Sequence, residues 1–338
     1  MRLSKGERRQ PGGRDSATKA VLILLFLIFS FGSMRSALAL DEVNLHISAG
    51  ISGNALVYRF AIEKGFYREE GLDVRAIQAG MLPGIQGLVG GSFHFSQILG
   101  QGAGAILRGL PLKVVMVFDT RPLNWLFARK EIRSVQDLKG GKQIAVSSFG
   151  AALDQMTRDL LAKRGIDPQK EVVLRAIEPT PARLAALMSG AVDAAVVNQM
   201  DRIIAKKNGF NELLFYGDDL EFVTAGAVTT ERLLAQRPEL VHRFLRGTLK
   251  GFHWLKTNEK EVVAKMIPLM KISESEAVDV YRAWLRVMSV DGTIPRSLQE
   301  KMLAFQRKSL KIERDVAPEN VYDLSIVRAL NHDLRKSK

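Results

Sequence analysis

The chain has 338 residues, of which 46% are hydrophobic and 25% charged, so it has room for two domains and a sizeable core. It contains no cysteine, which excludes a disulfide framework, a thiolate metal site and a cysteine nucleophile. The formal net charge of +13 would suit a nucleic-acid partner. Basic and acidic residues alternate along the expected helices, however, so we expect a solvated surface and no nucleic acid.

The first 39 residues have the pattern of a secretory signal peptide. Six Lys or Arg residues precede an apolar run over 20–32, which is short for a membrane span, and Ala37-Leu38-Ala39 is typical of a cleavage site. We expect cleavage after Ala39 and a soluble mature protein in the periplasm, because no cysteine is present to carry a lipid. Seven basic and two acidic residues lie in 1–39, so the total of +13 leaves +8 for the mature chain.

The same order of elements occurs twice in the mature chain, about one hundred residues apart. Copies over 45–95 and 143–197 each contain a strand, a glycine- or serine-rich loop, a helix, a strand, a short helix and a strand. The tripeptide Arg-Ala-Ile recurs at matching points, 75–77 and 175–177. Chance likeness between βαβ units is the alternative, but the ordered match favours a duplication. It predicts two similar α/β lobes with a ligand cleft between them.

The remaining pattern predicts how the chain passes between these lobes. Strands are expected at 43–47, 113–118, 192–197 and 222–230, and helices at 55–65, 134–138, 238–256, 259–270, 273–288, 295–308 and 321–334. The strand at 113–118 ends the first lobe and the strand at 222–230 returns to it. Two crossovers therefore join the lobes and act as a hinge. We predict lobe one over 40–120 and 223–338, and lobe two over 121–222.

Several phrases resemble the SsuA/TauA/NMT-type family of ABC-transporter substrate-binding proteins. They lie at 65–74 (GFYREEGLDV), 134–146 (SVQDLKG followed by QIAV), 181–196 (PARLAAL through VDAAV) and 320–325 (NVYDLS). The resemblance implies a type II periplasmic-binding-protein fold, in which each lobe is a βαβαβ-based sheet flanked by helices. It also implies a monomer without a cofactor that delivers a small-molecule ligand to an ABC permease with a cytoplasmic ATPase.

In this fold, ligands meet the loops after the strands, where helix N-termini offer free backbone N–H groups. The expected ligand contacts are Ser52, Gly53, Asn54, Met81, Ser96, Gln97, Arg121, Trp125, Ser147, Ser148, Phe149, Thr180, Asn198 and Gln199. Each has a structural alternative, such as helix capping for Thr180, a solvated hinge charge for Arg121 and hinge packing for Trp125. Asn198-Gln199-Met200 replaces an acidic residue and proline of many relatives, so no relative's ligand is carried over.

Catalysis finds little support in the sequence. The five histidines show no metal-ligand spacing, no Walker A motif is present, and neither Ser147 nor Ser148 lies in a nucleophile elbow. We expect a binding protein for a small organic anion such as a sulfonate, taurine or nitrate. Helix N-termini, Arg121 and the charge of +8 favour an anion, and the expected cleft loops contain no Asp or Glu. The alternatives are an enzyme on this fold, of the pyrimidine synthase or small-acid lyase type, and a periplasmic ligand-sensor domain.

Overall fold

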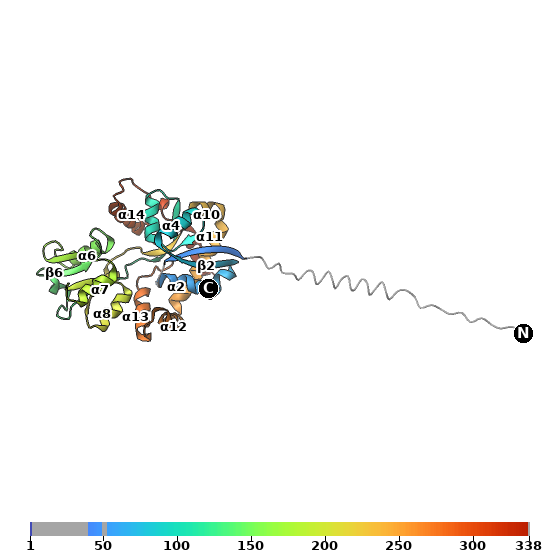
Figure 1. The fold of residues 1–338 in the computed structure, drawn as a ribbon. Coiled ribbons are helices and arrows are strands. Elements are labelled where there is room, and N and C mark those ends of the chain that lie inside the picture. Colours follow the sequence, from blue (N-terminus) through green and yellow to red (C-terminus); the bar gives the residue numbers. More distant parts are fainter. Residues whose placement is uncertain (2–39, 49–52, 337–338) are drawn as a thin grey trace. The chain divides into compact units, whose positions relative to one another are not determined.

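Two sheets of five strands each organise the chain in a computed structural model, which describes Met1, 40–48 and 53–336 (Figure 1). Sheet A has the order β2-β1-β3-β10-β4 and sheet B the order β7-β6-β8-β5-β9. The strands are β1 (Asp41–Ser48), β2 (Leu72–Ala79), β3 (Phe95–Ser96), β4 (Leu112–Asp119), β5 (Trp125–Ala128), β6 (Lys142–Val146), β7 (Val172–Ala176), β8 (Ala194–Val197), β9 (Asn211–Phe215) and β10 (Ala225–Thr230). The predicted signal peptide covers residues 1–39, and all of it except Met1 lies outside the described residues.

Helices follow most strands and cover the sheets. They are α2 (Gly53–Glu63), α3 (Phe66–Glu69), α4 (Met81–Gly90), α5 (Leu99–Leu107), α6 (Ala152–Lys163), α7 (Thr180–Met188), α8 (Gln199–Lys207), α9 (Tyr216–Asp219), α10 (Glu231–Gln236), α11 (Pro238–Thr257), α12 (Glu259–Met270), α13 (Glu274–Leu285), α14 (Arg296–Leu310) and α15 (Ser325–Lys336), with short 3₁₀ turns η1 (Val135–Leu138) and η2 (Pro318–Asn320). The two-sheet α/β architecture predicted from the repeat is confirmed.

The two sheets share one plan. In each, four strands run in the same direction and the fourth position is taken by one antiparallel strand, β10 in sheet A and β5 in sheet B. Arg75 pairs with Asn44 across β1 and β2, and its guanidinium reaches Glu42 Oε1 at 2.7 Å. Arg175 makes the matching contact to Gln143 Oε1 at 2.9 Å. The Arg-Ala-Ile repeat therefore marks equivalent positions in both lobes.

The two crossovers lie side by side. One leaves β4 at Asp119 and enters β5 at Trp125, and the other leaves β9 and enters β10 at Ala225, the partner of Asp119. Trp125 pairs with Val197, the last residue of β8. Both crossovers thus join the carboxyl-end edges of the two sheets, and these edges face one another. The predicted strand at 222–230 starts only at Ala225, because the residues before it span the gap between the sheets.

The first crossover supplies a strand that the sequence pattern did not predict. β5 lies inside sheet B, and its four residues are fully buried between β8 and β9. The predicted boundaries between lobe one and lobe two, at residues 120/121 and 222/223, remain a prediction. The strands of sheet A nevertheless come from 41–119 and 225–230, and those of sheet B from 125–215.

Gly226 in β10 allows the closest backbone approach beside the hinge. A Cβ atom there would lie 2.1 Å from Met116 O and 2.5 Å from Leu99 Cδ1. Gly226→Ala should lower the free energy of unfolding by about 1–3 kcal/mol or more, because the backbone must move. Gly100→Ala, in α5 with open space around it, is the matched control and should stabilise slightly. Urea denaturation measures both, and equal midpoints would contradict the packing argument.

Candidate functional site

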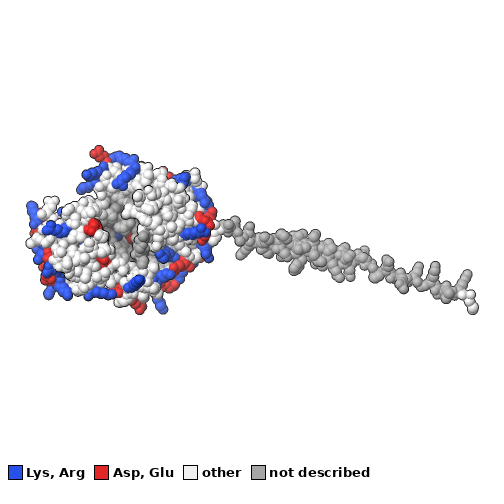
Figure 2. Space-filling model, in the orientation of Figure 1, with Lys and Arg blue, Asp and Glu red and all other residues white. Residues whose placement is uncertain are grey.

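The facing carboxyl-end edges of sheets A and B form the candidate site. Figure 2 shows the surface hollowed between the parts that carry the two sheets, with mainly uncharged residues around the hollow. Most residues expected to contact a ligand follow these strand ends. They are Gly53 and Asn54 at the start of α2, Met81 at the start of α4, Ser96 and Gln97 at the end of β3, Ser147 to Phe149 after β6, Thr180 at the start of α7, and Asn198 and Gln199 after β8. Ser52 lies outside the described residues.

A buried carboxyl group, Asp119, lies at the hinge end of this site. It is the last residue of β4 and only 3% exposed. Its carboxylate accepts hydrogen bonds from Trp284 Nε1 at 3.1 Å and Thr224 Oγ1 at 3.5 Å, and it also bonds to the Asn54 side chain. Burial raises the pKa of Asp119 to about 7, although these donors oppose the rise. Asp119 therefore changes charge near neutral pH.

Asp119 was not among the expected site residues. The sequence could have indicated Asp119, because it directly follows the apolar run 113–118. A polar side chain at the end of a buried strand lies at the edge where the expected loops meet. A second buried carboxyl, Asp201 in the first turn of α8, is 6% exposed, and burial raises its pKa while Arg183 opposes the rise. The expected cleft loops contain no Asp or Glu, but these two carboxyl groups come from the end of β4 and the first turn of α8, beside those loops.

Polar atoms at both edges are buried without a hydrogen-bond partner in the described part of the chain. Beside sheet A they are Asn54 Oδ1 and Gln97 Oε1, and beside sheet B they are Ser147 Oγ and Asp201 Oδ2. Gln97 is 8% exposed and Ser147 6% exposed. A buried polar atom left unpaired costs about 1–3 kcal/mol, so folding alone does not explain these groups. All four oxygens can accept a hydrogen bond, and the Ser147 hydroxyl can also donate one.

Arg121 and Trp125 belong to the hinge. Arg121 Nη1 donates to Gly217 O at 2.9 Å, which ties the first crossover to the second. Trp125 is 1% exposed and stacks on Phe215 with ring centroids 4.9 Å apart. The guanidinium of Arg202, a residue of α8, lies 4.8 Å from the Trp125 ring centroid. These contacts agree with the packing alternative for Trp125, and Nη1 of Arg121 is used by the backbone of the second crossover.

Three other expected contacts have structural partners. The Ser96 hydroxyl is hydrogen-bonded to His46 Nδ1 at 2.7 Å, Asn198 Oδ1 accepts from the backbone of Met200 and Asp201, and Thr180 Oγ1 accepts from Arg183 Nη2 at 2.8 Å. Asn198 thus caps α8, whereas the N-cap of α7 is Pro179 and, among the described residues, the Thr180 side chain makes no capping bond to the backbone.

The more accessible positions include large apolar side chains. Met81 is 51% exposed and Phe149 61% exposed, and Ser148 is also exposed. Gln199 is partly buried as the first residue of α8. These side chains stand after the strands β2, β6 and β8, and they can contact a molecule without any rearrangement of the core.

A pocket of about 490 Å³ lies elsewhere, between α11, α15 and the residues after α13, and none of the expected ligand contacts lines it. Among residues 40–48 and 53–336, no three His, Asp or Glu side chains are grouped to hold a metal ion. Within the same described ranges, the helices are too short or too polar to cross a membrane.

The raised pKa of Asp119 predicts how stability depends on pH. The folded state binds this proton more tightly than the unfolded state, whose pKa is near 3.8, so its contribution is present at low pH and lost as the pH rises through about 7. Asp119→Asn keeps a neutral group of the same shape. Its unfolding free energy relative to wild type should therefore increase from about pH 5 to about pH 8. Chemical denaturation at both pH values checks this, and a pH-independent difference would show that Asp119 is already ionised.

The chain is similar in sequence or in structure to several known proteins. Riboflavin-binding protein RibY from Chloroflexus aurantiacus is 27% identical over 224 residues, which cover 63% of this chain and 62% of RibY. The periplasmic sulfonate-binding protein SsuA from Methylobacillus flagellatus KT superposes with a TM-score of 0.70 at 18% identity, over 88% of this chain and 96% of SsuA. The desulfurization enzyme DSZB superposes with a TM-score of 0.66 at 15% identity, over 88% of this chain and all of DSZB (100%).

The structural likenesses confirm the two-lobe periplasmic-binding-protein fold, and their low identities show the fold alone. The family model described as NMT1/THI5-like matches residues 53–262, which is more than half of the chain and includes strands of both sheets. The chain belongs to the NMT1/THI5-like family.

Proposed function

We propose that this chain is the solute-binding component of an ABC importer. It binds a small organic solute between the carboxyl-end edges of its two sheets and delivers it to a membrane permease whose cytoplasmic ATPase supplies the energy. The observation that carries this proposal is the set of buried, unpartnered polar atoms on both edges in the described part of the chain, led by Gln97 after β3 and Ser147 after β6. Family membership and the fold shared with SsuA support it.

The protein acts in the periplasm as a monomer, after removal of residues 1–39. The basic n-region, the short apolar run and the Ala37-Leu38-Ala39 site support export. A hinge of two adjacent crossovers supports closure of the lobes around the solute.

The enzyme alternative has less support. DSZB shares the fold, so the fold alone does not separate binding from catalysis. General base catalysis needs a base within hydrogen-bond reach of the reacting proton. The carboxylate of Asp119 instead accepts from Trp284, Thr224 and Asn54, which position it as part of the wall. We therefore propose binding without chemistry.

The solute we propose is a small organic anion. The first turns of α2, α5 and α6 begin after strand ends at the facing edges, where helix N-termini favour an anion. Arg121 adds less than the sequence indicated, since it donates to the backbone of Gly217. The buried carboxyls Asp119 and Asp201 oppose an anion unless they are protonated. The likeness to RibY adds riboflavin to the sulfonates, taurine and nitrate as solutes to test.

Solute binding should depend on Ser147. Thermal-shift measurements with taurine, ethanesulfonate, nitrate and riboflavin identify a solute by its stabilisation of the mature protein. Ser147→Ala should then weaken affinity about 2- to 10-fold, the value of one hydrogen bond, with little effect on stability because Oγ has no partner among the described residues. Ser189→Ala, on an exposed turn, is the control. The proposal would be contradicted if no solute stabilised the protein. It would also be contradicted if Ser147→Ala and Ser189→Ala bound the identified solute with equal affinity.

Anion binding should also respond to pH. Protonation of Asp119 removes a negative charge beside the site, so affinity for an anion should rise as the pH falls through about 7. Calorimetry at several pH values measures this, and Asp119→Asn should flatten the dependence. A solute whose affinity is the same on both sides of neutrality in the wild type would contradict an anion bound near Asp119.

A further inference from the structure

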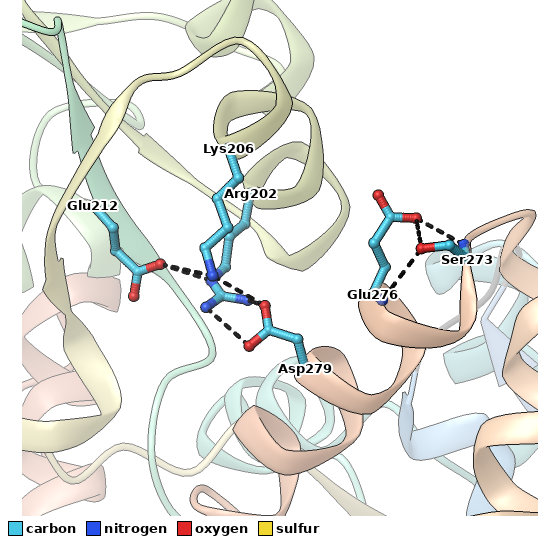
Figure 3. Close-up of polar contacts among 6 residues, drawn as sticks. All are labelled: Arg202, Lys206, Glu212, Ser273, Glu276 and Asp279. Carbon is cyan, nitrogen blue, oxygen red and sulfur yellow. Dashed lines mark hydrogen bonds and ion pairs between the residues drawn. The ribbon is translucent and has the colours of Figure 1, made fainter.

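Helices α8 and α13 are joined by ion pairs outside the candidate site (Figure 3). Lys206 Nζ lies 3.0 Å from Asp279 Oδ2, and the Arg202 guanidinium contacts both oxygens of the same carboxylate. One turn away, Lys207 Nζ lies 2.7 Å from Glu276 Oε1. We call these five residues the α8–α13 bridge. All of its basic residues come from α8, and all of its acidic residues come from α13.

Helix α8 is anchored to sheet B. The Arg202 side chain is 7% exposed, and its Nε donates to Glu212 of β9 at 3.0 Å. The same guanidinium stacks over Trp125, where the first crossover enters sheet B. Arg202 therefore connects the bridge to the hinge, and a shift of α8 moves sheet B with it.

Helix α13 is anchored to the part that carries sheet A. Tyr281 Oη donates to Leu255 O of α11 at 2.9 Å, and Trp284 Nε1 donates to Asp119 at the end of β4. α13 also packs against α12. The bridge thus connects the helices packed on sheet B with the helices packed on sheet A. It is made of long side chains, which separate more easily than interlocked apolar surfaces.

The bridge keeps its charges at neutral pH. The hydrogen bond from Lys207, followed by those from Ser273, holds the pKa of Glu276 down to about 2. Burial acts to raise the pKa of Asp279, but Arg202 and Lys206 outweigh it, and the pKa is lowered. Glu212 is the other acidic group beside Arg202 and Lys206, at 3.6 Å from Lys206 Nζ. The attraction between the helices is therefore controlled by salt rather than by pH near neutrality.

We propose that the α8–α13 bridge holds sheets A and B in their resting arrangement and so regulates solute affinity from outside the site. Attraction between α8 and α13 keeps the part that carries sheet A close to the part that carries sheet B, on the side of the hinge where these helices lie. When the bridge is weakened, the population shifts toward a wider separation, and the solute-binding state becomes rarer. Only this last consequence depends on the proposed function, since the separation of the helices is measurable without a solute.

The absence of cysteine from the sequence makes the test direct. Asn208→Cys just after α8 and Lys260→Cys on α12 introduce two thiols for spin labels, and both positions are exposed. Pulsed electron paramagnetic resonance then gives the distribution of distances between α8 and the helices beside α13. The measurement uses the mature protein at low and high ionic strength, without a solute.

Lys207→Glu places two negative charges together and should lengthen and broaden this distance, with a smaller effect at high salt. Asp279→Asn should act in the same direction without introducing repulsion. Glu276 is left unchanged because it also caps α13 through Ser273. Lys170→Glu makes the same charge change at a pair with Asp167, away from α13, and should leave the distance unchanged.

Equal distances in Lys207→Glu and Lys170→Glu, with native melting curves for both, would overturn the proposal. A longer distance in Lys207→Glu alone supports it, whether or not a solute is found. If one of the screened solutes binds, Lys207→Glu should weaken its affinity about two- to fivefold, the range of one exposed ion pair. If the distance lengthens in Lys207→Glu but none of the screened solutes binds, the proposed role of the α8–α13 bridge is supported. The missing binding then counts against the proposed function instead.

Discussion

The pairing of the two crossovers is the constraint on which the rest of the structure depends. The Phe222 amide donates to Thr120 O and the Tyr216 amide donates to Asn124 O, both at 2.9 Å, so the two segments run together between the sheets. They continue into strands that are themselves hydrogen-bonded, β4 with β10 and β5 with β9. The carboxyl-end edges must therefore face each other, and the loops after the strands meet in one place.

The side chains near the hinge are of two kinds: some are held by structural partners, and others have polar atoms without a partner among the described residues. Arg121 holds the second crossover, and Trp125 is sealed under Phe215 and Arg202. Gln97 and Ser147 have buried polar atoms that the described chain leaves unpaired. Because an unpaired buried group is costly, its retention at a strand end indicates a binding role more strongly than an exposed polar residue does.

The fold alone does not select the solute. Proteins named for riboflavin binding, sulfonate binding and desulfurization share sequence or structure with this chain. What differs is local chemistry, and here that chemistry includes Asp119, a carboxyl group whose pKa burial brings to about 7. The electrostatic character of the site thus depends on a residue that lies outside the repeated loops.

The sequence by itself determined the repeated order of elements, the strand ends and therefore most of the loops at the site, because hydrophobic period and turn residues are local properties. Arg75 and Arg175 match by their places in the two copies alone, and their contacts to Glu42 and Gln143 agree with that match. Only the tertiary structure decided that β5 enters sheet B, that Asp119 contacts Trp284, and that Arg202 of α8 meets Asp279 of α13. These contacts join residues far apart in the chain, and no local pattern encodes which distant partners packing brings together.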